Sequence, residues 1–114
     1  MSASVPLQAI AEDVYTAPQL TPEAMASAAE AGFKAVLNNR PDFEGGPDQP
    51  TSAAMEAAAQ AAGLVYAHLP VQGGYQSPEE ITQCAALLKA LPRPLLMFCR
   101  SGARSRQAAA LLRA

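Results

Sequence analysis

The sequence is poor in the residues that build disulfide frameworks, metal centres and aromatic binding surfaces. Its 114 residues include two cysteines, one histidine and no tryptophan, and aromatic residues make up 5%. Two cysteines in separate sequence contexts form neither a disulfide framework nor a metal-ligand set, and His68 alone does not complete one. We therefore predict no metal site and no cofactor.

Charged residues are also scarce, and they are unevenly distributed. They make up 16% of the chain, with a formal net charge of −2. Residues 1–80 carry ten acidic and two basic residues, a net charge of −8, whereas residues 81–114 carry six basic residues and no acidic one. A pI near 5.2, without a basic run or an aromatic stacking platform, argues against nucleic-acid binding. A local site for a small anion is compatible with the basic last third.

Long hydrophobic runs are absent as well. No stretch approaches the roughly 18 apolar residues of a membrane span, and the N-terminus lacks the basic start and apolar core of a signal peptide. We expect a cytoplasmic protein without membrane contact. The length and the 50% hydrophobic content fit one domain over residues 1–114.

Alanine-rich amphipathic runs alternate along the chain with short apolar runs. Capping residues, prolines and glycines separate them, which is typical of an α/β domain. The predicted helices cover residues 21–31, 52–62, 77–91 and 105–113. The predicted strands cover residues 33–38, 64–69 and 95–98, with an additional edge strand at 14–19. We expect a central, mostly parallel sheet of four to five strands, flanked by helices.

Ligands bind to such sheets at the carboxyl ends of the strands. The loops expected there are residues 39–50, 70–76 and 99–104. The last of them is the most informative, because a buried strand leads directly into Cys99 and then into the start of a helix. Successive backbone N–H groups can converge there on an anion, and a thiol facing them has its pKa lowered to roughly 3.5–7.5. Cys99 is therefore a candidate nucleophile.

The residues that follow Cys99 suit the same chemistry. The guanidinium of Arg104 can bind two oxygens of a tetrahedral anion, and Gly102 allows the backbone to approach it closely. Ser105 can cap the last helix and assist release of the thiolate. Arg100 is a candidate for attracting an anionic substrate, and the backbone amides from Arg100 through Ser101, Gly102 and Ala103 to Arg104 form the predicted substrate cradle.

Residues 99–105 (CRSGARS) resemble the catalytic loop of protein-tyrosine and dual-specificity phosphatases and that of single-domain rhodaneses. Residues 18–20 (PQL), 32–41 (GFKAVLNNRP) and 62–71 (AGLVYAHLPV) add a wider pattern. In this order and spacing they resemble the phosphatase-like domain of the beta-lactamase-hydrolase-like proteins. The resemblance implies a dual-specificity-phosphatase-like fold, with Cys99 as the nucleophile and Arg104 as the oxyanion-binding arginine.

Three departures from the phosphatase pattern keep sulfur chemistry open. Four residues separate Cys99 from Arg104, one fewer than in typical tyrosine phosphatases, and shorter loops accompany sulfur transfer in rhodanese-like proteins. The usual histidine before the cysteine is Phe98. The loop over residues 70–76 has no carboxylate to act as general acid, a group worth roughly 10²–10⁴ in rate. Asp42, with Glu44 and Asp48 nearby, is the candidate replacement.

The remaining polar residues have competing interpretations. Arg40 can contact substrate or hold its loop in place, and His68 is better explained as a hydrogen-bonded structural residue than as an acid or base. Cys84 lies on the apolar stripe of a predicted helix, which favours an inert core thiol over a resolving thiol.

We thus predict a cysteine-dependent hydrolase that acts on a phosphomonoester. The close alternative is a sulfurtransferase that carries a persulfide on Cys99, and the third reading is a non-catalytic module that senses an anion or binds a partner. The expected ligand is a small anion, either a phosphate ester or a sulfane-sulfur donor. A persulfide-oxidising metallo-beta-lactamase-like protein is the partner that the resemblance implies.

Overall fold

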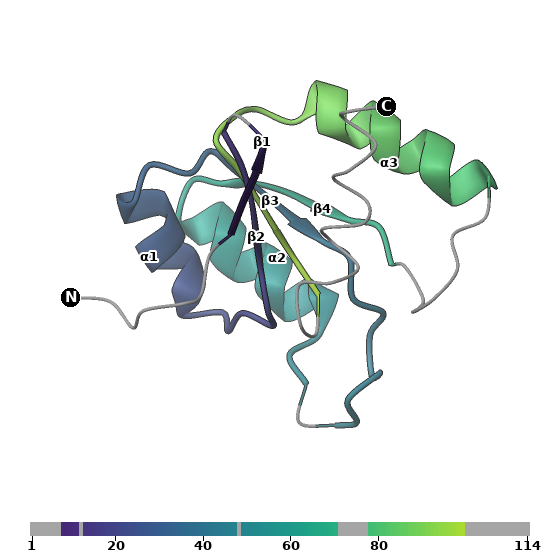
Figure 1. Cartoon of the computed structure of the whole chain (residues 1–114). Coiled ribbons are helices and arrows are strands. Elements are labelled where there is room, and N and C mark those ends of the chain that lie inside the picture. The colour runs from purple at the N-terminus through teal and green to yellow at the C-terminus, as the bar shows by residue number, and fades with distance from the viewer. Residues whose placement is uncertain (1–7, 12, 48, 71–77, 100–114) are drawn as a thin grey trace.

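A five-stranded sheet runs through the centre of the molecule, with helices against both of its faces (Figure 1). The computed structural model describes residues 8–11, 13–47, 49–70 and 78–99 of the chain. The strands are β1 (Gln8–Ala11), β2 (Val14–Ala17), β3 (Ala35–Asn38), β4 (Val65–His68) and β5 (Leu95–Phe98). The helices are α1 (Ala24–Glu30), α2 (Ser52–Ala61) and α3 (Pro78–Ala90). The predicted α/β class is confirmed.

The strand order is β1-β2-β5-β3-β4, so the last described strand in the sequence lies in the middle of the sheet. Leu95 of β5 pairs with Val14 of β2 on one side and with Ala35 of β3 on the other, and both pairings are parallel. β3 also pairs with β4 in parallel, and only β1 runs antiparallel to its neighbour. The central position explains why every residue of β5 is apolar and buried.

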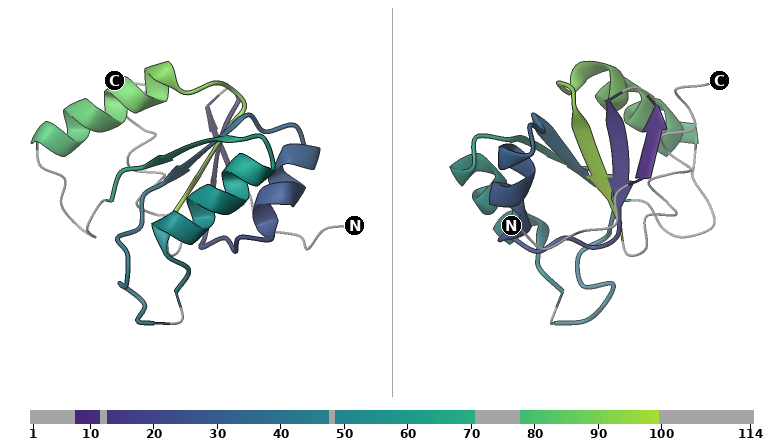
Figure 2. Two further views of the ribbon diagram at one scale, coloured as in Figure 1. Left: turned by 180° about the vertical axis from the view of Figure 1, so that it is seen from behind. Right: turned by 60° about the vertical axis from the view of Figure 1, so that its left-hand side comes forward.

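Side chains alternate between the two faces of the sheet, and each face has its own hydrophobic cluster. On one face, Leu95 and Met97 of β5 pack with the apolar side of α3. On the other, Leu96 and Phe98 pack with α1 and α2. Figure 2 shows α3 on one side of the sheet and α1 and α2 on the other. The sheet is therefore covered on both sides, and the site must lie at an edge rather than on a face.

Local signals fix the ends of α2. The hydroxyl of Thr51 accepts a hydrogen bond of 3.1 Å from the N–H of Ala54, which satisfies an exposed donor at the helix start. Gly63, with φ at +84°, follows the last turn and lets the chain leave in the left-handed conformation. The predicted start near Ser52 is confirmed, and Thr51 is the capping residue.

Helix α1 begins later than predicted. The hydroxyl of Thr21 accepts a hydrogen bond of 3.3 Å from the N–H of Ala24, but residues 21–23 form a turn that precedes the helix. Pro22 therefore lies in that turn and not at the first helical position.

The strand predicted at residues 14–19 differs in length and position. It ends at Ala17 and lies inside the sheet, between β1 and β5. Pro18 comes after the strand, so its missing N–H removes no hydrogen bond from the ladder. The outer strand on this side of the sheet is β1, for which no strand was predicted. Ser77, at the start of the helix predicted at 77–91, and the helix predicted at 105–113 lie outside the described residues.

Candidate active site

The carboxyl ends of β2, β5, β3 and β4 lie side by side along one edge of the sheet, because these four strands are parallel and in register. Cys99 directly follows β5 at this edge and is buried. Its N–H donates a hydrogen bond of 3.4 Å to the carbonyl of Ala17, the last residue of β2. The candidate nucleophile therefore lies where the central strand ends.

Asn39 joins three strand ends at the same edge. Its backbone N–H donates to the carbonyl of Phe98 at 2.8 Å, beside Cys99. Its buried side-chain amide donates to the carbonyl of Leu69, just after β4, at 3.2 Å. A polar side chain in this buried position needs such a partner, because an unpaired amide there would be destabilising. Asn39 thus keeps the chain after β3 close to Cys99.

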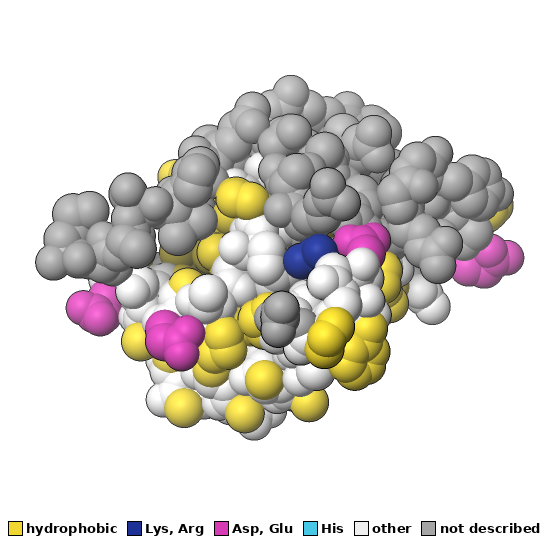
Figure 3. Space-filling model, turned by 90° about the horizontal axis from the view of Figure 1, so that it is seen from below, with side chains coloured by type: hydrophobic (Ala, Val, Ile, Leu, Met, Phe, Trp, Pro, Cys, Tyr) yellow, Lys and Arg dark blue, Asp and Glu magenta, His cyan; other side chains and the backbone are white. Residues whose placement is uncertain are grey.

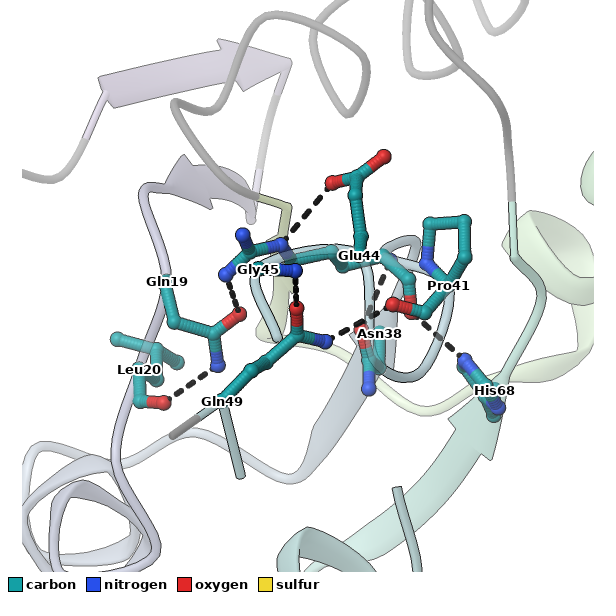
Figure 4. Close-up of polar contacts among 9 residues, drawn as sticks. Gln19, Leu20, Asn38, Pro41, Glu44, Gly45, Gln49 and His68 are labelled. Atoms are coloured by element: carbon teal, nitrogen blue, oxygen red, sulfur yellow. Dashed lines mark hydrogen bonds and ion pairs between the residues drawn. The ribbon is translucent and has the colours of Figure 1, made fainter. Parts of the chain in front are cut away.

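Arg40 contacts other parts of the protein through its side chain and its backbone. Figure 4 labels its partners Gln19, Glu44 and His68. The Nε of its guanidinium is 3.0 Å from Oε1 of Glu44, and Nη1 donates to Oε1 of Gln19 at 3.0 Å. Its carbonyl lies 2.9 Å from Nε2 of His68, which must carry the proton because a carbonyl only accepts. The side chain is almost fully buried. The contacts of Arg40 and His68 match the loop-holding and structural interpretations of these residues.

The side chain of Gln49 joins two backbone groups of the loop between β3 and α2. Its Nε2 donates to the carbonyl of Pro41 at 2.8 Å, and its Oε1 accepts from the N–H of Gly45 at 2.7 Å. A Cβ added to Gly45 would lie 2.6 Å from Nη2 of Arg40, so a larger residue there would require the guanidinium to shift. The loop is thereby folded tightly around Arg40.

Asp42 is exposed and contacts the start of α2. One carboxylate oxygen accepts a hydrogen bond of 2.7 Å from the N–H of Ser52. The hydroxyl of Ser52 lies 2.8 Å from the hydroxyl of Tyr66. The Tyr66 hydroxyl accepts a second hydrogen bond, of 3.0 Å, from the side-chain amide of Asn38. Burial raises the pKa of Tyr66 above its usual value, so this hydroxyl keeps its proton at neutral pH.

Three of the predicted site residues, Cys99, Arg40 and Asp42, lie in the described part, all at the carboxyl edge of the sheet. The predicted residues of the cradle and its arginine lie outside the described residues: Arg100, Ser101, Gly102, Ala103, Arg104 and Ser105. Their roles stay predictions.

Sequence reasoning assigned no role to Gln49, Tyr66 or Gln19. Gln49 and Gln19 make contacts that depend on how a loop folds, and no spacing rule reveals such contacts. Tyr66 carried a readable signal, because a half-buried tyrosine in a sheet strand usually finds a hydrogen-bond partner for its hydroxyl.

Seen from below, a basic side chain of the described residues lies next to an acidic one, with hydrophobic side chains beside them (Figure 3). Within the described ranges, no group of three or more His, Cys, Asp or Glu side chains could hold a metal ion. None of the helices in those ranges is long and apolar enough to cross a membrane.

The family model of the beta-lactamase hydrolase-like protein, phosphatase-like domain, matches residues 6–114. A beta-lactamase hydrolase-like protein from Xylella fastidiosa strain Temecula1 is 35% identical over 77 residues, which is 68% of this chain and 18% of that protein. One from Agrobacterium fabrum strain C58 is 34% identical over 74 residues, 65% of this chain and 17% of that protein. The chain spans less than a fifth of the length of these relatives.

Solved structures share the fold. A Neisseria meningitidis protein, provisionally ascribed phosphatase activity, has a TM-score of 0.82 and 28% identity, over 92% of this chain and 74% of its own. The core catalytic domain of a PP-IP phosphatase from S. cerevisiae, solved with citrate, has a TM-score of 0.66 and 15% identity. That match covers 89% of this chain and 60% of the yeast domain. The predicted phosphatase-like fold is confirmed.

Proposed function

Because the chain belongs to the family of the beta-lactamase hydrolase-like protein, phosphatase-like domain, we propose that it is a cysteine-dependent phosphatase acting on a phosphomonoester. One observation supports this above the others: Cys99 is at the carboxyl end of the central strand β5. Parallel α/β sheets bind their ligands at that edge. A nucleophile at the end of the middle strand is reached by loops from both neighbouring strands.

The proposed reaction has two displacements at phosphorus. The Cys99 thiolate forms a bond to phosphorus while the bond to the ester oxygen breaks, and that oxygen leaves with the electron pair and takes up a proton. Water then forms a new bond to phosphorus, the bond to sulfur breaks, and inorganic phosphate leaves. Backbone amides of residues 100–104 and the Arg104 guanidinium would hold the oxyanion, and Ser105 would assist the thiolate as it leaves.

Asp42 is the proposed donor of the proton to the leaving oxygen. For this role it must exchange its hydrogen bond with the N–H of Ser52 for one with the substrate. Glu44 is a weaker candidate, because its carboxylate pairs with the buried guanidinium of Arg40. The described side-chain contacts of Arg40, with Glu44 and Gln19, hold the loop in place. We propose that the edge of its guanidinium also contacts the substrate.

Sulfur transfer is the second candidate function, and the binding of Asp42 to the start of α2 favours it. This reaction needs no general acid. The Cys99 thiolate would attack the sulfane sulfur of a donor such as thiosulfate, the sulfur–sulfur bond of the donor would break, and sulfite would leave with the electron pair. The resulting persulfide would pass its outer sulfur to another thiol. A persulfide-oxidising metallo-beta-lactamase-like protein is the partner proposed for this reaction.

Two parallel assays separate the candidates. Purified protein is incubated with an aryl phosphate and, separately, with thiosulfate; phosphate release and the intact mass of the protein are measured, with Cys99→Ser as the matched variant. Phosphate release that disappears in Cys99→Ser supports the phosphatase. A gain of one sulfur atom on Cys99 without phosphate release supports the sulfurtransferase and contradicts the phosphatase. Bound phosphate or sulfate without either reaction favours an anion-sensing module.

A further inference from the structure

Phe43 has two features that packing does not explain. Within the described ranges, Phe43 and Val65 are the large hydrophobic residues that are exposed, at 65% and 48%. Phe43 also has φ at +63°, in the left-handed region that bulky residues rarely adopt. A ring that is 65% exposed buries little apolar area, so packing within the chain does not offset this strain. Such strain is concentrated at sites that bind ligands.

The neighbours of Phe43 impose this conformation. Asp42 on one side is hydrogen-bonded to the N–H of Ser52, and Glu44 on the other is paired with Arg40. The carbonyl of Phe43 itself accepts a hydrogen bond of 3.0 Å from the N–H of Gly46, which closes a tight turn. Because the backbone is fixed on both sides, the ring is presented to solvent in a defined place and needs little ordering when a ligand binds.

The loop that presents Phe43 is at the same edge as Cys99. It leaves β3 through Asn39, whose N–H is bonded to the carbonyl of Phe98. Val65, by contrast, is at the start of β4, where it pairs with Ala35 at the amino edge of the sheet. Of these two large hydrophobic side chains of the described ranges, Phe43 is the one in a loop at the candidate active site.

The charges on this loop do not favour a highly charged ligand. Among the described basic residues, Arg40 alone is at the carboxyl edge, and its charge is balanced by Glu44 at 3.0 Å. Asp42 adds an exposed carboxylate to the same loop. The other described basic residues, Lys34, Lys89 and Arg93, are found near the amino ends of β3 and β5.

We propose that Phe43 is a specificity residue of the Cys99 site, whose ring packs against an apolar, preferably aromatic, group of a ligand with a single phosphate-like anion. Glu44 contributes to the same selectivity, because it neutralises Arg40 and so disfavours ligands with several phosphates. The proposal rests on the proposed function, since it assumes that an anion binds beside Cys99. It adds the class of molecule to which that anion is attached.

The first test compares two non-hydrolysable probes that carry the same anion, benzylphosphonate and ethylphosphonate. Their affinities are measured by calorimetry with Cys99→Ser, so that turnover plays no part. We expect benzylphosphonate to bind about threefold to tenfold more tightly, as one aromatic contact provides. Phe43→Ala in the same background should remove this preference, Phe43→Tyr should keep it, and Val65→Ala is the matched control. Urea unfolding checks that each variant is folded.

The outcomes separate this proposal from the proposed function. Equal affinity for both probes, loss of the preference in Val65→Ala, or failure of both probes to bind overturns the role of Phe43. Phosphate release from an aryl ester without any aryl preference leaves the phosphatase standing and overturns the specificity. An aryl preference without phosphate release supports the role of Phe43 in binding and contradicts the phosphatase activity.

The second test concerns Glu44 and uses inorganic phosphate and pyrophosphate as probes. Glu44→Gln should raise the affinity for pyrophosphate relative to phosphate by several-fold, because it leaves the charge of Arg40 unbalanced. Glu30→Gln changes the net charge equally at the exposed end of α1 and is the matched control. The same gain in both variants, or a gain in neither, overturns the role of Glu44.

Discussion

Thr16 is a polar residue in an otherwise apolar part of the sheet. It lies on β2, opposite Met97, and its buried hydroxyl has no hydrogen-bond partner among the described residues. A buried hydroxyl without a partner costs about 1–3 kcal/mol of stability. Thr16→Val removes the hydroxyl and keeps the branched shape, so we expect the free energy of unfolding to rise by about 1 kcal/mol. Urea denaturation with tyrosine fluorescence measures the change.

The same substitution at Thr51 should have the opposite sign. The hydroxyl of Thr51 accepts from the N–H of Ala54 at the start of α2, and loss of such a cap costs about 0.5–2 kcal/mol. If Thr16→Val and Thr51→Val change the free energy of unfolding equally, the presence of a hydrogen-bond partner does not determine how each hydroxyl affects stability.

Single residues show what the sequence could and could not predict about the site. Cys99 was identifiable because a buried strand leads straight into it, and the structure has it at the end of β5. The contacts of Arg40 were not predictable, since Gln19 is 21 residues away and the two meet only when β2 and β3 pair with the same central strand. Contacts of this kind depend on the assembled sheet and leave no local pattern.

At the scale of the element, α3 shows how burial controls a thiol. Cys84 lies on its apolar side, packed against the sheet, and burial raises the pKa of this thiol to about 11. A thiol in an unfolded chain titrates near pH 8.5. The native protein therefore binds this proton more tightly, and its stability must fall as the pH rises from about 8.5 through about 11.

We expect this loss to reach roughly 3 kcal/mol and to be absent in Cys84→Ala. The measurement is urea unfolding of both proteins at about pH 8 and about pH 10.5. Tyr66, whose pKa is also raised, contributes in the same direction to both proteins, so the difference between them isolates Cys84. An equal loss of stability in both proteins contradicts the prediction. The high pKa also argues against Cys84 as a resolving thiol at neutral pH.

Helices and strands were predictable where an apolar or alanine-rich run is bounded by a capping residue, a proline or a glycine. The apolar run of β5, the alanine-rich α2 and the glycines at 32 and 63 each carry a local physical signal, and the structure confirms them. β1 was missed because its residues (QAIA) form no continuous apolar run like that of β5, and because the turn at Asp13 to its antiparallel partner contains no glycine or proline.

At the scale of the whole molecule, two hydrophobic clusters share one sheet. Leu88 of α3 belongs to the cluster on one face and Met55 of α2 to that on the other. Because β5 and β3 contribute to both clusters, neither side can unfold without exposing the strands that support the other. Leu88→Ala and Met55→Ala should each cost about 2–5 kcal/mol and leave a single cooperative transition. Circular dichroism and tyrosine fluorescence should give the same midpoint; separate transitions would show independent halves.

The position of β5 also matters for the order in which the sheet can form. β2 and β3 do not pair with each other; each pairs with β5, which lies between them. The residues of β5 follow their partners in β2 and β3 by more than half of the chain length. During synthesis, β2 and β3 therefore cannot be joined in one sheet until Leu95–Phe98 has been made. Such long-range pairing is slow, because the loops between the partners must be closed before any contact is gained. The strand that leads into Cys99, the proposed nucleophile, is thus also the one that joins the two halves of the sheet.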